Sequence, residues 1–287
     1  MRLLPLLGGH FHVFALLRDP AGAASVRERG ATPILGDLDK PKSLKRLSGL
    51  ADDIVHMAPP PDKGARDTRT THLIQSLARS RHLPQRLVYL STSGVYGDCA
   101  GEAVPESRPV SPQTDRARRR VHAEHQLRAW GRAHGVRVSV LRVPGIYAGD
   151  RLPLQRLAVG TPALLPEEDS YSNHVHADDL ARMVLAALRH GRAGRSYNAN
   201  DDSDLRMGEY FDLVARQFGF PPPPRISRRE AQEVIPAPLL SFMKESRRLD
   251  NRRLKRELGF AFRYPTVKDG LGAMGAIPAA AGPRIHR

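Results

Sequence analysis

The sequence predicts an α/β protein built on a doubly wound parallel sheet, with a small and discontinuous C-terminal lobe. Two observations carry this prediction. Apolar runs of strand length recur along the first half of the 287 residues, and each is followed by a segment with helical character. Strands and helices that alternate in this way form a parallel sheet covered by helices on both faces. The length allows one large domain or a domain with a smaller lobe.

The alternation is regular up to residue 143. A helix-like stretch at 1–7 comes first, and the glycines after it, Gly8 and Gly9, are expected to cap it. Strands should follow where short runs of β-branched and apolar residues are bounded by turn residues. We expect strands at 12–18, 32–38, 52–59, 86–93 and 136–143, and helices at 20–30, 41–50, 71–80 and 117–135.

Beyond residue 144 the pattern is less regular. A turn near residue 172 leads into an amphipathic helix that ends near residue 191, and 196–200 could form a late strand. Another helix is expected at 208–220, where a run of four prolines ends it. The basic segment 225–275 is expected to be mostly helical, and the Ala-, Gly- and Pro-rich segment 276–287 to be a flexible tail.

The formal net charge of +15 raises the question of a nucleic-acid partner, because clustered Lys and Arg neutralise phosphates. The basic residues are 38 arginines and 7 lysines, spread along nearly the whole length. Such a skew is typical of biased codon usage as much as of selection for a binding surface. The densest run, 116–120, falls on an expected helix, where a solvated face explains it. We therefore expect no specific nucleic-acid partner.

The start of the chain and the single cysteine bear on the compartment. The start has a basic residue and an apolar run, as a signal peptide does, but Gly8, Gly9, His10 and His12 interrupt that run. No window offers about 18 uninterrupted apolar residues, so we expect no transmembrane helix. Cys99 has no partner for a disulfide within the chain, which favours a reducing compartment. We expect a cytoplasmic protein without a membrane partner.

The segment LVYLSTSGVYGD at 87–98 resembles the extended short-chain dehydrogenase/reductase superfamily, NAD-dependent epimerase/dehydratase group, in which this strand ends in a Ser/Thr cluster followed by Val-Tyr-Gly. The closing segment 241–266 is also similar to that family. Other segments agree in order and approximate spacing, namely RDP at 18–20, GDL at 36–38, HMAPPP at 56–61, LRVPGIYAGDR at 141–151 and NHVHADDLA at 173–181. The resemblance covers nearly all of the chain and implies a Rossmann-type fold.

The beginning of the chain departs from that family. A dinucleotide-binding fold opens with a strand and a glycine-rich turn, whose backbone N–H groups approach the pyrophosphate at a helix N-terminus. Here MRLLPLL at 1–7 is similar to the helix after that turn, and Gly8 and Gly9 follow this helix instead of preceding it. The omitted strand would be central to the sheet, leaving orphaned backbone groups. We therefore expect a misplaced start, with the native protein beginning roughly ten to fifteen residues upstream.

The family's acid–base pair is also absent. The resemblance implies a tyrosine that exchanges a proton with the substrate, and a lysine one helical turn later. Aligning AEHQL at 123–127 with the family places Arg116 in the tyrosine position and Arg120 in the lysine position. Arginine remains charged near neutral pH and cannot serve as the acid or the base. Tyr264 and Lys268 have the required spacing but follow no suitable strand, so we interpret that match as a coincidence.

The resemblance implies a dinucleotide cofactor, NADP or NAD. Arg18 follows an early strand at a position where a basic residue suits the phosphate of NADP, whereas Asp19 beside it keeps NAD possible. NADP is slightly favoured, although an exposed arginine that opens a turn also explains Arg18. The cofactor-binding residues implied by the resemblance are Arg18, Asp37, Leu38, Ala58, Pro59, Pro60, Ser91 and Pro144.

The resemblance also assigns catalytic and substrate residues. Thr92, four residues before Tyr96, stands where the family has the hydroxyl that hydrogen-bonds the reacting oxygen of the substrate. Tyr96 is either a displaced proton donor or a structural residue of its loop. Arg151 follows a turn and would bind an anionic substrate, which in this family is often a nucleotide diphosphate. The candidate substrate residues are Ser93, Tyr147, Arg151, Asn173 and His174.

A cluster of His174, His176, Asp178 and Asp179 has the composition of a metal site. Neither a third nor a fourth ligand has a convincing source, and the family match makes Asp178 or Asp179 the N-cap of a helix. We therefore expect no metal.

These observations lead to two hypotheses. The first is an NAD(P)-dependent oxidoreductase or a nucleotide-sugar epimerase/dehydratase-like protein of the atypical extended type, acting on a small-molecule substrate. The second is a non-catalytic dinucleotide-binding or redox-sensing protein. We assign an N-terminally incomplete NAD(P)-binding domain to 1–150 and a mainly substrate-side lobe to 151–275, in which 173–200 returns to the Rossmann core. The oligomeric state does not follow from the sequence.

Overall fold

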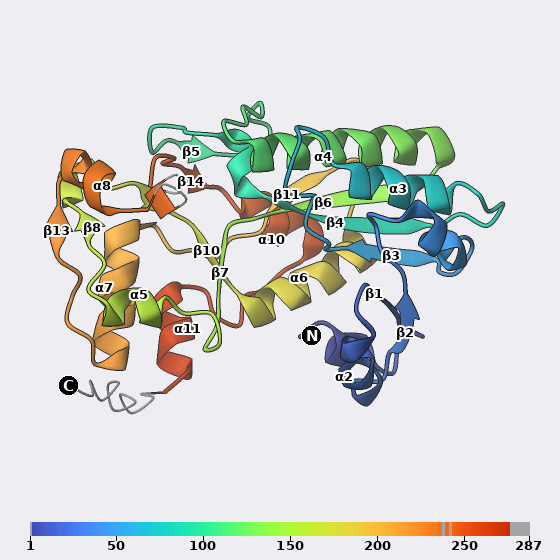
Figure 1. Cartoon of the computed structure of the whole chain (residues 1–287), viewed down its shortest axis with the longest axis horizontal. Coiled ribbons are helices and arrows are strands. Elements are labelled where there is room, and N and C mark those ends of the chain that lie inside the picture. Colours follow the sequence, from blue (N-terminus) through green and yellow to red (C-terminus); the bar gives the residue numbers. More distant parts are fainter. Residues whose placement is uncertain (1, 237–238, 241–242, 276–287) are drawn as a thin grey trace.

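A four-stranded parallel sheet forms the centre of the computed structural model, which describes residues 2–236, 239–240 and 243–275. The strand order is β11-β6-β4-β3, so β4 lies between β3 and β6 and pairs with both in parallel (Figure 1). The strands are β3 (Asp53–His56), β4 (Arg86–Thr92), β6 (Arg137–Val143) and β11 (Ser196–Asn198).

The first two strands form a separate parallel pair, β1 (Phe14–Leu17) and β2 (Thr32–Leu35). Within the described residues β1 pairs only with β2, and β3 pairs only with β4. The short helix α1 (Leu4–Leu7) packs on the main body through Leu7, and Gly8 closes it by donating to the Leu4 carbonyl, as the sequence predicts.

Helices cover both faces of the sheet. α3 (Thr68–Leu77) and α4 (Asp115–His134) share one hydrophobic cluster with one face of the sheet. α6 (Ala177–His190) and α10 (Arg252–Leu258) share a second cluster with the opposite face. Figure 1 shows α3 and α4 above the sheet and α6 below it. The predicted doubly wound α/β fold is therefore confirmed.

A second group of elements lies next to the carboxyl ends of β4 and β6, at the left of Figure 1. Its central helix is α7 (Met207–Phe218), whose buried face packs on α5 (Leu154–Ala158) and α11 (Val267–Ala273).

The other elements of the described chain are short. They are α2 (Ala23–Glu28), α8 (Arg228–Val234), β5 (Ala103–Val104), β7 (Gly145–Tyr147), β8 (Ala163–Leu164), β9 (Tyr171–Ser172), β10 (His174–His176), β12 (Leu205–Arg206), β13 (Arg225–Ile226), β14 (Arg248–Leu249) and the 3₁₀ helices η1 (Pro20–Gly22), η2 (Pro41–Leu47), η3 (Ser93–Tyr96) and η4 (Pro166–Glu168).

Two parts of the chain differ from the predicted secondary structure. The helix expected at 41–50 is the 3₁₀ helix η2, which starts at Pro41. Within 225–236, 239–240 and 243–275 the chain is less helical than predicted, because extended segments separate the helices. Part of that chain, β14, pairs with β5, a contact between residues about 145 positions apart that no local pattern announces. The expected tail at 276–287 lies outside the described residues.

The N-cap of α6 is His176, which corrects the expectation that Asp178 or Asp179 would have this role. The His176 ring accepts a hydrogen bond from the Asp178 backbone N–H at 3.2 Å. Asp179 instead turns inward and accepts from the backbone N–H groups of Arg263 and Tyr264. A buried carboxylate of this kind ties the start of α6 to the C-terminal segment.

Candidate active site

A cavity of about 610 Å³ lies where the carboxyl ends of β4 and β6 face the elements around α7. Ligands of parallel α/β sheets bind at this edge, because the loops that leave the strands converge there. Thr92 and Pro144 line the cavity from the sheet, Arg116 and Arg120 from α4, and Tyr210 from α7. We therefore take this cavity as the candidate active site.

Thr92 is the last residue of β4 and the N-cap of η3. Its hydroxyl oxygen accepts a hydrogen bond from the Gly94 N–H at 3.3 Å. A hydroxyl that accepts one bond still has its own proton to donate, here to an oxygen of a molecule in the cavity. Ser93 also lines the cavity and is buried, whereas Ser91 is buried outside the lining.

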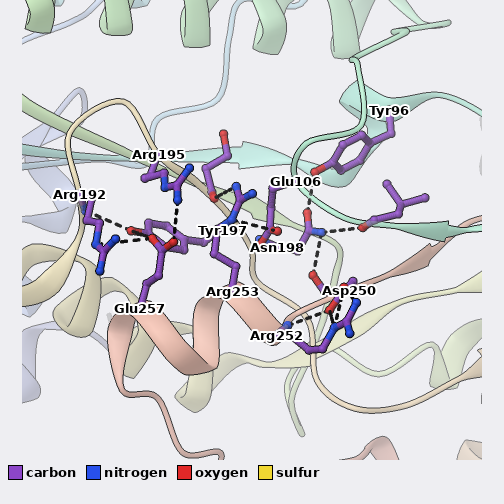
Figure 2. A network of polar contacts seen from close by, with 12 residues as sticks. Tyr96, Glu106, Arg192, Arg195, Tyr197, Asn198, Asp250, Arg252, Arg253 and Glu257 are labelled. Atoms are coloured by element: carbon purple, nitrogen blue, oxygen red, sulfur yellow. Dashed lines mark hydrogen bonds and ion pairs between the residues drawn. The ribbon is translucent and has the colours of Figure 1, made fainter.

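Tyr96 lies outside the cavity lining and its hydroxyl is used elsewhere. Figure 2 shows this hydroxyl pointing at Asn198, to whose Oδ1 it donates at 2.8 Å. The Asn198 amide donates in turn to the carbonyls of Val104 and Asp250, and the Asn198 backbone N–H donates to Glu106. Burial raises the pKa of Tyr96. The geometry thus gives Tyr96 a structural bond between η3 and the end of β11.

Arg116 and Arg120 both line the cavity, one helical turn apart on α4. The Nη1 atom of Arg120 donates to the Leu90 carbonyl at 2.9 Å, the Tyr89 hydroxyl at 3.1 Å and the Ala58 carbonyl at 3.4 Å. These bonds fix the guanidinium at the ends of β3 and β4. Since all three partners are neutral, they leave its charge uncompensated.

Tyr147 and Arg151 reach the cavity from the chain that leaves β6. The buried Tyr147 hydroxyl donates to the Thr266 carbonyl at 3.2 Å, and burial raises its pKa. A Cβ atom on Gly270 would lie 2.3 Å from this hydroxyl, so only glycine lets α11 approach it. Arg151 is exposed at the cavity wall.

Asn173 and His174 also line the cavity, but their side chains have partners within the protein. Asn173 accepts from the Leu249 N–H at 2.8 Å and donates to the Arg247 carbonyl at 2.9 Å. The His174 Nε2 lies 3.0 Å from the Ser172 hydroxyl, and its ring stacks on Tyr210. Burial lowers the pKa of His174 to about 3, so the ring is neutral and supplies no acid near pH 7.

The predicted cofactor-binding residues lie outside the cavity lining, with the exception of Pro144 after β6. Arg18 is exposed, while the Asp19 carboxylate next to it caps η1 by accepting from the Ala21 N–H. Asp37 accepts from the Asp39 N–H at 2.9 Å, and Leu38 is buried in the core.

The loop that follows β3 is held by two arginines. The carbonyls of Pro59 and Pro60 accept from Arg69, and the Ala58 carbonyl accepts from Arg120. Arg69 is held in turn by a two-bond contact with the Asp39 carboxylate. The loop therefore has a fixed course toward the sheet edge.

Sequence reasoning missed Arg156, Arg247 and Tyr210. The Arg156 guanidinium carbon lies 4.0 Å from the Phe211 ring centroid, and Nη2 donates to the Pro162 carbonyl. Burial lowers the pKa of Arg156 to about 10. No local signal distinguishes these arginines from the many others. Arg156 reaches the cavity through the packing of α5 on α7, and Arg247 through the segment before β14, where it donates to the Gly97 carbonyl.

Among the described residues, no group of three or more His, Cys, Asp or Glu side chains is placed to hold a metal ion. No helix in the same part of the chain has the length and apolar character needed to cross a membrane.

The sequence profile of the NAD dependent epimerase/dehydratase family matches residues 4–199. The chain belongs to this family. It is 27% identical to protein YeeZ of Escherichia coli K12 over 219 residues. This alignment covers 75% of this chain and 72% of that protein. It is 27% identical over 150 residues to a dTDP-glucose 4,6-dehydratase of Streptomyces niveus, with 50% of this chain and 45% of that enzyme covered.

Solved structures of similar proteins share the fold of this epimerase/dehydratase family member. A conserved protein of unknown function from Silicibacter pomeroyi is 28% identical, with a TM-score of 0.78 over 95% of this chain and 93% of that one. DesIV of Streptomyces venezuelae, a dTDP-glucose 4,6-dehydratase with NAD and TYD bound, is 24% identical, with a TM-score of 0.75 over 95% and 90%. The family predicted from the sequence motifs is confirmed.

Asp201 carries a buried carboxyl, and its backbone N–H donates to the carbonyl of the lining residue His174 at 2.8 Å. Its titration should be visible in the stability of the fold. Its Oδ1 accepts from the Ser203 N–H at 3.0 Å, while Oδ2 is buried without a hydrogen-bond partner among the described residues. Burial raises the pKa of Asp201 to about 7, against about 3.9 in an unfolded chain. The stability it contributes is therefore present below about pH 4 and lost as the pH rises to about 7.

We expect Asp201→Asn to match the native chain in stability near pH 4 and to exceed it increasingly up to about pH 7, with a constant difference above. Urea unfolding at a series of pH values measures this difference. Burial also lowers the pKa values of His56 and His174, so their protonation destabilises the fold as the pH falls below about 6.5. Both chains contain these histidines, and their effect therefore cancels in the difference. A difference that does not change with pH would contradict the assignment.

Proposed function

We propose that this chain is an NAD(P)-dependent oxidoreductase or epimerase/dehydratase-like protein of an atypical kind, acting on a nucleotide-sugar-like substrate. The observation that carries the proposal is the Thr92 hydroxyl, which ends the central strand β4 at the wall of a cavity large enough for a small molecule. Membership of the NAD dependent epimerase/dehydratase family supports it.

The described residues fit parts of a dinucleotide. Asp37 and Leu38 follow β2 where an adenosine would lie, and Pro144 and Thr92 line the cavity where a nicotinamide would lie. Among residues 2–236, 239–240 and 243–275 no glycine-rich turn opens a helix toward the pyrophosphate. The fit therefore concerns the two ends of the cofactor.

The charge at β1 favours NADP over NAD in this proposal. Asp19, the residue suited to the ribose hydroxyls of NAD, has its carboxylate engaged in capping η1. Arg18, which suits the additional phosphate of NADP, is exposed directly after the strand. A phosphate bound there would gain a charge-assisted hydrogen bond.

In the proposed reaction Thr92 donates a hydrogen bond to the substrate oxygen at the reacting carbon and thereby polarises that bond. The nicotinamide supplies or accepts the hydride when it is bound. Arg120 holds the ends of β3 and β4 in register beside this point. We do not assign the proton transfer to Tyr96, because its hydroxyl is bonded to Asn198 outside the cavity lining.

A second candidate is a non-catalytic dinucleotide-binding or redox-sensing protein. The observation that favours it is the presence of Arg116 and Arg120 on the cavity wall of α4, because a guanidinium is neither an acid nor a base near pH 7. Such a protein would bind the dinucleotide without turning it over.

Titration of NADPH and NADH into the full chain, followed by fluorescence, tests the proposal. We expect binding of both, with NADPH bound more tightly, and oxidation of NADPH when a panel of carbonyl substrates is added. Binding without oxidation of the cofactor across the panel would favour the second candidate. If neither dinucleotide binds, both candidates are wrong.

A further inference from the structure

The cavity of the candidate active site carries an excess of positive charge. Within the described residues its lining contains one carboxylate, Glu245, and five arginines. The single negative charge of Glu245 offsets only one of the five positive charges. Its carboxylate accepts hydrogen bonds from both Nη atoms of Arg247 at 2.8 Å. The other four lining arginines are Arg116, Arg120, Arg151 and Arg156.

These four cations come from two separate parts of the lining. Arg116 and Arg120 belong to the N-terminal half of α4, which contacts η3 and so lies near Thr92. Arg151 and Arg156 belong to α5 and the chain before it, on the side of α7. A ligand that spans the cavity from the reacting carbon outward meets positive charge at both ends.

In each of these parts one guanidinium is held in place by neutral groups. The three bonds of Arg120 all use Nη1, and a guanidinium has further donors on Nη2 and Nε. Arg156 lies on the Phe211 ring and donates to the Pro162 carbonyl, while its Nε is buried with no partner in the described part of the chain. Neither guanidinium forms a hydrogen bond with a carboxylate in the described residues, and the Asp169 carboxylate attracts Arg156 only from a distance. Positively charged groups held in this way are suited to receive an anion.

We propose that the substrate is anionic at both ends, with a carboxylate at the reacting end bound by Arg116 and Arg120, and a phosphate bound by Arg151 and Arg156. The inference rests on the proposed function, since it specifies the substrate class of that site. The substrate class is a phosphate-linked acidic sugar. A planar carboxylate accepts two parallel bonds from a guanidinium, whereas a neutral sugar hydroxyl offers no charge to the α4 pair.

Two pairs of probes that differ only at this group test the proposal. UDP-glucuronic acid and UDP-glucose form one pair, and glucuronic acid 1-phosphate and glucose 1-phosphate form the other. Calorimetry on the full chain should show the acidic member of each pair binding at least about tenfold more tightly, as one charge-assisted contact requires. Arg116→Gln should reduce this preference severalfold, since Arg120 remains, and should change the affinity for the neutral member much less.

The matched control is Arg118→Gln, which removes the same charge from α4 at an exposed residue paired with Asp115. It should keep the preference of the native chain. Arg156→Gln should weaken both members of a pair by a similar factor, because both carry the phosphate. These contrasts separate a local contact from a general effect of charge.

Equal affinity within both pairs, or a preference that is undiminished in Arg116→Gln, would overturn the inference while leaving the proposed function in place. Preference within the sugar phosphate pair, without binding of either UDP compound, would support the inference and contradict the nucleotide part of the proposed function. If none of the four probes binds, both are wrong.

Discussion

Glu124→Gln is expected to destabilise the fold by about 3–5 kcal/mol, because it leaves the buried Arg142 and the partly buried Arg128 without their counter-charge. Glu124 on α4 is 1% exposed and accepts from Arg142 of β6 at 2.8 and 3.2 Å. Arg128 lies 3.0 Å from the same carboxylate. Burial alone raises the pKa of Glu124, but the bonds and charges of these arginines outweigh it, and the net pKa is lowered.

The free energy of unfolding in urea measures this effect. Asp115→Asn is the matched control, since it removes a carboxylate from the same helix that pairs with Arg118 at the surface. An exposed pair of this kind contributes less than about 1 kcal/mol. If the two variants lose similar amounts of stability, the ion pairs of Glu124 with Arg142 and Arg128 do not contribute more to the fold than an exposed pair does.

Thr92→Ala is expected to reduce turnover at least about tenfold while cofactor binding is retained. The substitution removes the hydroxyl that faces the cavity at the end of β4 and leaves the strand itself in place. Turnover should fall because the variant lacks a hydrogen bond that strengthens as charge develops on the substrate oxygen. Turnover and dinucleotide affinity must therefore be measured on the same preparations.

Thr92→Ser serves as the control for this prediction, because it keeps the hydroxyl and its bond from the Gly94 N–H. We expect turnover close to that of the native chain. Unchanged turnover in Thr92→Ala would remove Thr92 from the mechanism, whereas equal losses in both variants would indicate that packing of the threonine methyl group, and not the hydroxyl, is what matters.

The position of Thr92 shows how a local pattern can predict part of a site. The apolar run at 86–92 identifies a buried strand, and a hydroxyl directly after such a run must lie at its carboxyl end. In a parallel sheet that end is where ligands bind. Pro144, directly after β6, lines the cavity in the same way. Arg116 and Arg120 line it from helix α4, where the sequence alone suggested a solvated face.

Tyr96 and Asn173 show where this reasoning ends. Both follow strand ends and carry polar groups, yet Tyr96 donates to Asn198, and Asn173 exchanges hydrogen bonds with the chain at Arg247 and Leu249. Their partners are between 74 and 102 residues away in the sequence. Whether a polar side chain faces a ligand or the protein depends on partners that only folding brings near.

The sequence by itself determined the doubly wound parallel sheet and the family, because strand and helix periodicities and short motifs are properties of neighbouring residues. Only the tertiary structure decided which arginines face the cavity. Arg156 reaches it because α5 packs on Phe211 of α7, and Arg247 because the segment before β14 passes beside Gly97. Contacts of this kind join distant segments through packing and buried hydrogen bonds, so no local pattern in the chain contains them.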